Sequence, residues 1–346
     1  MKISTDTKLD YSDVLIVPKT NDLVSRNDVS LERTIQFKHS NNSWTGVPIM
    51  VANMDTTGTI EMALEMQKNK IITCLHKFYN INELEYAITE LNLDPEYFAI
   101  SCGTGEHDLT KLKEITQIIS PKFICLDVAN GYLNRVIEVI EKIRELYPNI
   151  TLIAGNVVTH DVVLKYYNAG VDIVKMGIGS GSVCTTRLQT GIGYPQLSCM
   201  LDTRPNIPDD CYIISDGGIQ LPGDFSKAYG AGADFVMSGG MFAGHEECSG
   251  DIIEENGTKY KVFYGMSSEN AMKKHYGTVS KYRSSEGKCV KIKYRGRVAD
   301  TLQNILGGIR STMTYIGAHS MEEVYSKTEF IKVNNQANRI YTGKEV

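Results

Sequence analysis

Short apolar runs alternate along the chain with longer polar or amphipathic segments. Most of the eight runs begin 21 to 28 residues after the previous one, which is the length of one strand, one helix and two loops. Nearly continuous apolar runs are typical of strands that are buried on both faces, and strand alternating with helix indicates a parallel sheet. Eight such units predict an α/β fold, a TIM (β/α)8 barrel. The runs are 47–54, 71–76, 97–103, 123–129, 151–158, 172–179, 212–219 and 234–243.

The regular spacing is interrupted after the sixth and the eighth runs. The sixth and seventh runs begin 40 residues apart, which predicts a long loop after strand six. Catalytic loops of barrels lie at the carboxyl ends of the strands, so this loop is a candidate for the active site. A second insertion spans 245–294, and within it 251–261 predicts a polar hairpin with a turn at Asn256-Gly257.

Segments between and after the runs predict surface elements. Charged amphipathic helices are expected at 61–70 and 80–91, and a final helix at 297–313. The basic, serine-rich run 281–288 is open to two interpretations, a ligand-binding flap or a solvated loop. The polar tail 331–346 is expected to lie on the surface.

The long loop after strand six carries the strongest chemical signal of the chain. Cys184 stands in a glycine-rich stretch that begins at Gly177, and Thr185, Thr186 and Arg187 follow it directly. A thiol near a fixed positive charge and backbone N–H groups loses its proton more easily, which favours a nucleophile. The alternative is a buried cysteine in a glycine-rich turn.

Two glycine pairs end the seventh and eighth runs, Gly217-Gly218 and Gly239-Gly240. The loops after these two barrel strands often bind phosphate through backbone N–H groups, and a side chain there would block the phosphate oxygens. Asp216 precedes the first pair and is a candidate for ribose binding, or else an N-cap. Met266 and Ser267 offer a purine or phosphate contact, although a methionine is more often part of the core.

Composition narrows the function further. The chain has 346 residues and a net charge of −5, which argues against a dedicated nucleic-acid binder. It contains no apolar run long enough to span a membrane and no signal-peptide pattern at its start, so we expect a cytoplasmic protein. Eight dispersed cysteines without a CxxC pair argue against zinc and disulfide frameworks. No Gly-x-Gly-x-x-Gly motif opens a βαβ unit, so a Rossmann module is not predicted.

Several segments together resemble the IMP dehydrogenase/GMP reductase family, over residues 8–340. They are YSDVLIVP at 11–18, ANMD at 52–55, the Cys184 loop with GIGYPQ at 191–196, DGGI at 216–219 and GGMFAG at 239–244. The resemblance implies one catalytic barrel domain over 1–346. Relatives of the dehydrogenase branch usually insert a pair of regulatory (CBS) domains after the second strand, and the 20 residues between His76 and Tyr97 leave no room for them.

Other segments are similar to the reductase branch, namely HK at 76–77, residues 263–269, YRSSEGK at 282–288 and LGGIRST at 306–312. The resemblance then implies NADPH-dependent deamination of GMP to IMP and ammonia. Cys184 would attack C2 of the purine, Thr186 and Glu286 would relay a proton to the leaving ammonia, and Lys77 would lie near the nicotinamide. Two alternatives stay open: a dehydrogenase that lacks regulatory domains, and a nucleotide-binding barrel without catalytic activity.

The resemblance also assigns binding residues. The substrate would contact Asp216, Gly217, Gly218, Gly239, Gly240, Met266, Ser267, Arg283, Ser284 and Gly287. NADPH would contact Lys77, Asp127, Val128, Ala129, Ile178, Gly179, Tyr282, Arg283, Ser311, Thr312, Met313 and Thr314. Backbone carbonyls near Gly179, Gly181, Cys184 and Arg187 would bind a monovalent cation such as K⁺. Relatives imply a homotetramer. Ser180 and Phe78 depart from the family pattern, which often has Pro and His there.

Overall fold

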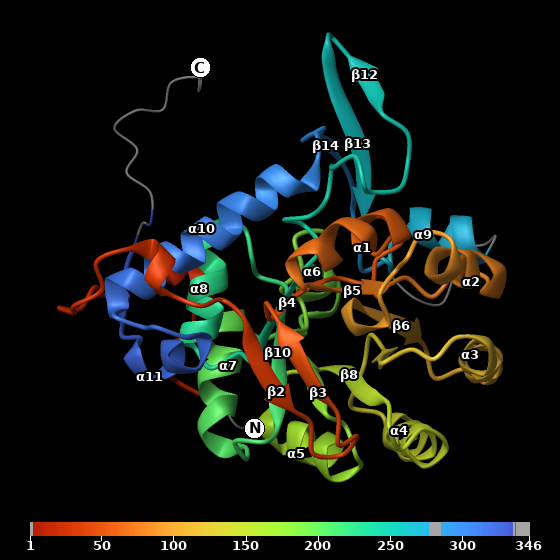
Figure 1. Cartoon of the computed structure of the whole chain (residues 1–346), viewed down its shortest axis with the longest axis horizontal. Helices are drawn as coiled ribbons and strands as arrows, with labels where there is room; N and C mark the ends of the chain where they lie inside the picture. The colour runs from red at the N-terminus through yellow and green to blue at the C-terminus, as the bar shows by residue number, and fades with distance from the viewer. Residues whose placement is uncertain (1–2, 277–284, 335, 337–346) are drawn as a thin grey trace.

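A computed structural model describes residues 3–276, 285–334 and 336 of the chain. Its centre is a closed barrel of eight parallel strands in the order β10-β11-β4-β5-β6-β7-β8-β9, which confirms the predicted (β/α)8 barrel (Figure 1). All eight predicted runs contain a barrel strand. These are β4 (Ile49–Val51), β5 (Ile72–Leu75), β6 (Phe98–Cys102), β7 (Phe123–Asp127), β8 (Thr151–Val157), β9 (Ile173–Met176), β10 (Tyr212–Asp216) and β11 (Phe235–Ser238).

Each barrel strand is followed by a helix that packs on the outside of the sheet. In α4 the buried residues are Val136, Val139, Ile140 and Ile143, and this spacing places them on one face. The outer helices are α1 (Ile60–Met66), α2 (Ile81–Thr89), α3 (Glu106–Ile118), α4 (Asn134–Leu146), α5 (His160–Asn168), α7 (Gln196–Thr203), α8 (Pro222–Gly230) and α10 (Val298–Ile316). The helices predicted at 61–70, 80–91 and 297–313 correspond to α1, α2 and α10.

The amino-terminal end of the barrel is closed by an antiparallel hairpin that the sequence analysis did not predict. It consists of β2 (Arg33–Gln36) and β3 (Ser43–Gly46). Ile35, Phe37 and Trp44 are buried in one cluster with the inward-facing residues of the barrel, such as Met50 and Phe123. The hairpin therefore covers the apolar interior at this end. The opposite end of the barrel, where the strands have their carboxyl ends, is not covered by it.

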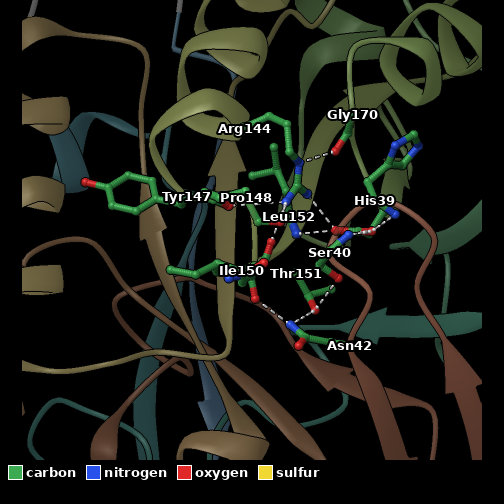
Figure 2. Close-up of polar contacts among 12 residues, drawn as sticks. His39, Ser40, Asn42, Arg144, Tyr147, Pro148, Ile150, Thr151, Leu152 and Gly170 are labelled. Carbon is green, nitrogen blue, oxygen red and sulfur yellow. Dashed lines mark hydrogen bonds and ion pairs between the residues drawn. The ribbon is translucent and has the colours of Figure 1, made fainter.

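An arginine network joins this hairpin to the barrel, as Figure 2 shows. Arg144 donates to Asp172 Oδ2 at 2.7 Å and to the carbonyl oxygens of Gly170 and Ile150, each at 2.9 Å. Asp172 Oδ1 accepts the backbone N–H groups of His39 and Ser40 at 3.1 Å, both in the turn that connects β2 to β3. One buried carboxylate thus connects α4, the start of β9 and the hairpin.

The insertion after β11 forms a small three-stranded antiparallel sheet and a helix. Its elements are β12 (Ile253–Glu255), β13 (Thr258–Tyr264), α9 (Glu269–Tyr276) and β14 (Cys289–Lys293), and Figure 1 shows β12 and β13 projecting above the barrel. The predicted hairpin is confirmed: Asn256 and Gly257 have φ values of 52° and 72°, as a type I′ turn requires. Of the run 281–288, residues 281–284 lie outside the described residues.

Segments near the two ends of the chain lie side by side. β1 (Val14–Ile16) pairs antiparallel with β15 (Phe330–Lys332), which begins immediately before the predicted polar tail. A short helix, α11 (Val324–Lys327), precedes β15. All eight cysteines are free thiols, and no helix among the described residues has the length and apolar character to cross a bilayer.

Candidate active site

A cavity of about 600 Å³ opens at the carboxyl ends of the barrel strands, beneath the insertion. This size and position are typical of a substrate site in a barrel. Most of the described residues that the sequence assigned to a site meet here. Those that line the cavity are Lys77, Asp127, Val128, Ala129, Ile178, Gly179, Gly181, Cys184, Thr186, Asp216, Gly217, Gly218, Gly239, Gly240, Met266, Ser267 and Glu286.

Cys184 begins a chain of hydrogen bonds that ends at a carboxylate. Its thiol donates to Thr186 Oγ1 at 3.2 Å, and the Thr186 hydroxyl donates to Glu286 Oε2 at 2.7 Å. The backbone N–H of Thr185 also donates to the Glu286 carbonyl at 2.9 Å, and Gly287 forms a β-bridge with Cys184. Two segments 100 residues apart in sequence thus form one unit with a thiol, a hydroxyl and a carboxylate.

The loop that carries Cys184 is fixed by Arg187 and its glycines. Arg187 donates to both carboxylate oxygens of Asp10, at 2.9 and 3.3 Å, and to the carbonyl of Tyr194. The hydrogen bond with Asp10 raises the pKa of Arg187. Gly179 has a φ of +81°, and a Cβ there would lie 2.6 Å from the Arg187 side chain, so only glycine fits.

The predicted cation site is made of backbone oxygens on this same loop. The Gly181 carbonyl accepts the Cys184 N–H at 3.0 Å. Among the described residues no cluster of three or more His, Cys, Asp or Glu side chains is arranged to hold a metal ion. A monovalent cation on carbonyl oxygens therefore stays a prediction.

A buried lysine on the cavity floor was missed by the sequence analysis. Lys175 Nζ lies 2.6 Å from Asp127 Oδ1 and 3.0 Å from Asp216 Oδ2, and Asn156 donates to the same Asp216 oxygen at 2.8 Å. Burial alone would lower the pKa of Lys175, but the charges of Asp127 and Asp216 raise it well above its ordinary value. Burial alone would raise the pKa of Asp127, and Lys175 lowers it below the usual carboxylate range. A lysine inside an otherwise apolar run, Ile173 to Met176, was the available signal.

The two glycine pairs form a close backbone cradle. Cβ atoms at Gly217 and Gly240 would lie 2.7 and 2.6 Å from the hydroxyl oxygens of Ser180 and Ser182. The N–H groups of Gly217 and Gly218 already donate to Met237 O and Ser180 O. Among the described residues none accepts a hydrogen bond from the N–H of Gly239 or Gly240. These two amides are the better candidates for binding an anion.

The segment from Gly265 to Ser268, which is predicted to contact the purine, lies between the Cys184 loop and the barrel rim. Glu286 N donates to Ser267 O at 3.2 Å, and Met266 Sδ accepts the N–H of Asp55 at 3.4 Å. Met266 is therefore at the cavity wall rather than in the main core, which favours the predicted ligand contact over the core alternative.

The loop after β5 brings Lys77 to the cavity beside a carboxylate. Lys77 Nζ lies 3.4 Å from Asp108 Oδ1. Burial lowers the pKa of the preceding His76 to about 4, so its ring is neutral, and its Nδ1 accepts the N–H of Phe78 at 3.3 Å. Phe78 stacks on His275 of α9, with 3.4 Å between ring centroids and 3° between planes. Phe78, one of the two expected departures from the family pattern, thus contacts the insertion.

The other departure, Ser180, also makes a contact that the usual proline could not make. Its hydroxyl donates to the carbonyl of Asp216 at 2.8 Å and connects the Cys184 loop to the end of β10.

Not every predicted site residue is brought to the cavity. Ser311, Thr312, Met313 and Thr314 lie on α10, and none of them lines it. The Ser311 hydroxyl instead donates to Gly307 O at 2.9 Å. Tyr282, Arg283 and Ser284 lie outside the described residues. The roles of all these residues as ligands stay predictions.

Comparisons with known proteins identify one family. Residues 8–340 match the model of the IMP dehydrogenase / GMP reductase domain. The chain is 48% identical over 342 residues to GMP reductase 1 of Mus musculus, covering 98% of this chain and 99% of the relative. It is 50% identical over 350 residues to GMP reductase of Caenorhabditis elegans, covering 100% and 97%. It is 50% identical over 344 residues to GMP reductase of Shigella boydii, covering 99% of both chains.

Proposed function

Since the chain belongs to the IMP dehydrogenase/GMP reductase family, we propose that it is a GMP reductase, which converts GMP, NADPH and a proton to IMP, ammonia and NADP⁺. The observation that carries this proposal is the hydrogen-bonded series Cys184–Thr186–Glu286 on the cavity wall. A protein that only bound nucleotides would have no need for a thiol connected to a proton source.

The cavity offers separate contacts for the parts of GMP. The N–H groups of Gly239 and Gly240, which have no acceptor among the described residues, would bind the phosphate. Asp216 Oδ2 is occupied by Lys175 and Asn156, which leaves Oδ1 for a ribose hydroxyl. The segment at Met266 and Ser267 would contact the purine and orient its C2 toward the Cys184 sulfur.

The proposed chemistry proceeds by covalent catalysis. The Cys184 thiolate forms a bond to C2 of the purine, and the amino group at C2 leaves as ammonia after it receives a proton. Thr186 is within hydrogen-bond distance of both Cys184 and Glu286, so it would pass the proton from the carboxyl group to the leaving nitrogen. After reduction at C2 the carbon–sulfur bond breaks, which releases IMP and restores the thiolate.

The residues present fit a dinucleotide cofactor. Ser101 lines the cavity, and its buried hydroxyl has no hydrogen-bond partner among the described residues, so a carboxamide could satisfy it. NADPH, when bound, supplies a hydride to C2 of the purine. Lys77, Asp127, Val128, Ala129, Ile178 and Gly179 would hold it along the rim of the barrel. Tyr282, Arg283 and residues 311–314 complete the proposed set.

Further parts of the proposal concern a bound cation, the oligomeric state and the location of the enzyme. A monovalent cation such as K⁺ would be held by backbone carbonyls at Gly179, Gly181 and Cys184, and Arg187 would fix their loop by its ion pair with Asp10. We also propose a homotetramer located in the cytoplasm. The short connection between β5 and β6, which contains α2, supports the reductase over a dehydrogenase with inserted regulatory domains.

The test follows the near-ultraviolet absorbance of NADPH with purified protein and GMP. We expect oxidation that depends on GMP and that falls at least about 10³-fold in Cys184→Ala, because the covalent route is lost. Cys289→Ala is the matched control: this cysteine is exposed and does not line the cavity, so its rate should not change. Reduction of NAD⁺ with IMP, without activity toward GMP, would identify a dehydrogenase instead.

A further inference from the structure

Asp55 lies just beyond β4, after Asn53 and Met54, which line the cavity. Its side chain is 1% exposed. One carboxylate oxygen, Oδ2, accepts three hydrogen bonds: from the Tyr264 hydroxyl at 2.7 Å, from His275 Nε2 at 2.6 Å and from Lys274 Nζ at 3.1 Å. All three donors belong to the insertion after β11, so this one carboxylate joins two parts of the chain that are more than 200 residues apart.

The backbone of Asp55 contacts the same insertion. Its carbonyl accepts the Ser249 hydroxyl at 2.7 Å, and its N–H donates to Met266 Sδ at 3.4 Å. Burial alone would raise the pKa of Asp55, but the bonds from His275, Tyr264 and Lys274 lower it, so the residue is a carboxylate at neutral pH. Oδ1 is buried without a partner among the described residues. A buried charge of this kind is costly, and its donors must stay in place to keep it.

A second contact reinforces this attachment. The His275 ring, held by Asp55, stacks on Phe78 in the loop that carries Lys77. The helix α9 is therefore bound to the loops after β4 and β5 at once. The segment just before α9 is also connected to Glu286, because the Glu286 N–H donates to the Ser267 carbonyl.

We propose that Asp55 is a positioning residue, which fixes the insertion on the barrel rim and so sets the place of Met266, Ser267 and Glu286 over Cys184. This proposal rests on the proposed function. Asp55 itself does not line the cavity, so it acts through Tyr264, Lys274 and His275 rather than on the substrate. Charged hydrogen bonds to a buried group are among the strongest polar contacts, and the carboxylate has three of them.

A role limited to general stability makes a different prediction. If Asp55 only supported the fold, its loss would reduce the amount of active protein and lower kcat, while the KM for GMP would stay the same. If it positions the purine-facing segment, the KM for GMP must rise. Local hydrogen exchange in 264–275 must also become faster than in the barrel strands.

The experiment compares Asp55→Asn with the native chain. The variant keeps the size of the side chain and removes its charge. We expect the KM for GMP to rise about tenfold, as the loss of one charged hydrogen bond predicts. Amide exchange in 264–275, measured without any nucleotide, should become at least about tenfold faster. Glu255→Gln is the matched control, because this carboxylate belongs to the same insertion, is exposed on β12 and pairs with Lys291.

Two outcomes would overturn the proposal. One is an unchanged KM for GMP together with unchanged exchange in 264–275. The other is exchange that becomes faster over the whole barrel, which would mean a purely structural role. Should Asp55→Asn not fold, Tyr264→Phe removes one donor and keeps the buried ring, and its KM for GMP should rise about threefold. The exchange measurement needs no substrate, so it also decides the proposal if the native chain does not reduce GMP.

Discussion

At the scale of single residues, the floor of the cavity depends on Lys175. Its side chain is 3% exposed, and its ammonium group lies between two carboxylates that both face the cavity. Asp216 is proposed to bind ribose as well, so Lys175 keeps one of its oxygens engaged and leaves the other for the ligand. The lysine therefore has both an electrostatic and an orienting role.

Lys175→Met should destabilise the protein by about 2–3 kcal/mol at neutral pH, because two carboxylates then face one another without a cation. In the native chain the pKa of Asp127 is lowered, so its stabilising contribution is present above the ordinary carboxylate pKa and is lost as pH falls through the lowered value. In the variant, repulsion between the two carboxylates raises the pKa of Asp127 instead. The loss of stability relative to the native chain should therefore become smaller as pH falls toward about 4.

Urea unfolding at neutral and at mildly acidic pH measures this difference. Lys293→Met, at an exposed position of β14, is the control and should change stability by no more than about 0.5 kcal/mol. A deficit of the same size at both pH values would contradict the electrostatic explanation.

At the scale of elements, the hairpin of β2 and β3 depends on a buried ion pair. Asp172 is 0% exposed at its side chain and Arg144 is 15% exposed. Arg144 also satisfies carbonyl groups where α4 ends and where α5 meets β9, so it replaces the water that these groups would otherwise require.

Arg144→Met should lower the free energy of unfolding by about 3–5 kcal/mol, since Asp172 is left as a buried charge without a cation. The turnover of the folded fraction should not change, because this network lies at the amino-terminal end of the barrel. Denaturant unfolding of this variant and of Lys142→Met measures the effect. Lys142 is an exposed residue on the same helix and serves as the control. Adding Asp172→Asn to Arg144→Met should recover part of the loss; a further loss of the full size would show that the two residues act independently.

The sequence predicted the barrel because its strands are apolar on both faces, and it predicted the Cys184 loop because glycines and hydroxyls cluster there. It did not predict β1, β2, β3 or β15, which have only three or four residues each, and β2 and β3 also carry exposed polar residues at every second position. It also missed Asp55 and Lys175. Their roles depend on partners 41 to 220 residues away, and no local pattern reports such contacts.

At the scale of the whole molecule, the pairing of β1 with β15 joins residues 14–16 to residues 330–332. The ladder joins Val14 to Lys332 and Ile16 to Phe330, and Val17 N donates to Glu329 O at 2.9 Å. Phe330 packs against the main core. These contacts are made outside the closed barrel, so they add stability without being required for its closure.

Removal of residues 329–346 should therefore destabilise the chain by about 2–4 kcal/mol, from the half-buried ring of Phe330 and several hydrogen bonds, and leave a closed barrel. Denaturant unfolding followed by circular dichroism measures the loss. Lys332→Thr, at an exposed site in β15, is the control and should be nearly neutral. A truncated chain without cooperative unfolding would show that the strand pair is essential to the barrel.

The closed strand order has a consequence for the synthesis of this protein. β4 pairs with β5 on one side and with β11 on the other, and β11 leaves the ribosome last of the eight strands. At typical translation rates β11 is synthesised roughly 10 to 40 s after β4, and Glu286 is synthesised roughly 5 to 20 s after Cys184. A nascent chain thus carries the Cys184 thiol well before it carries the Glu286 carboxyl group. The closed barrel and the hydrogen-bonded series Cys184–Thr186–Glu286 therefore form only late in the synthesis of the chain.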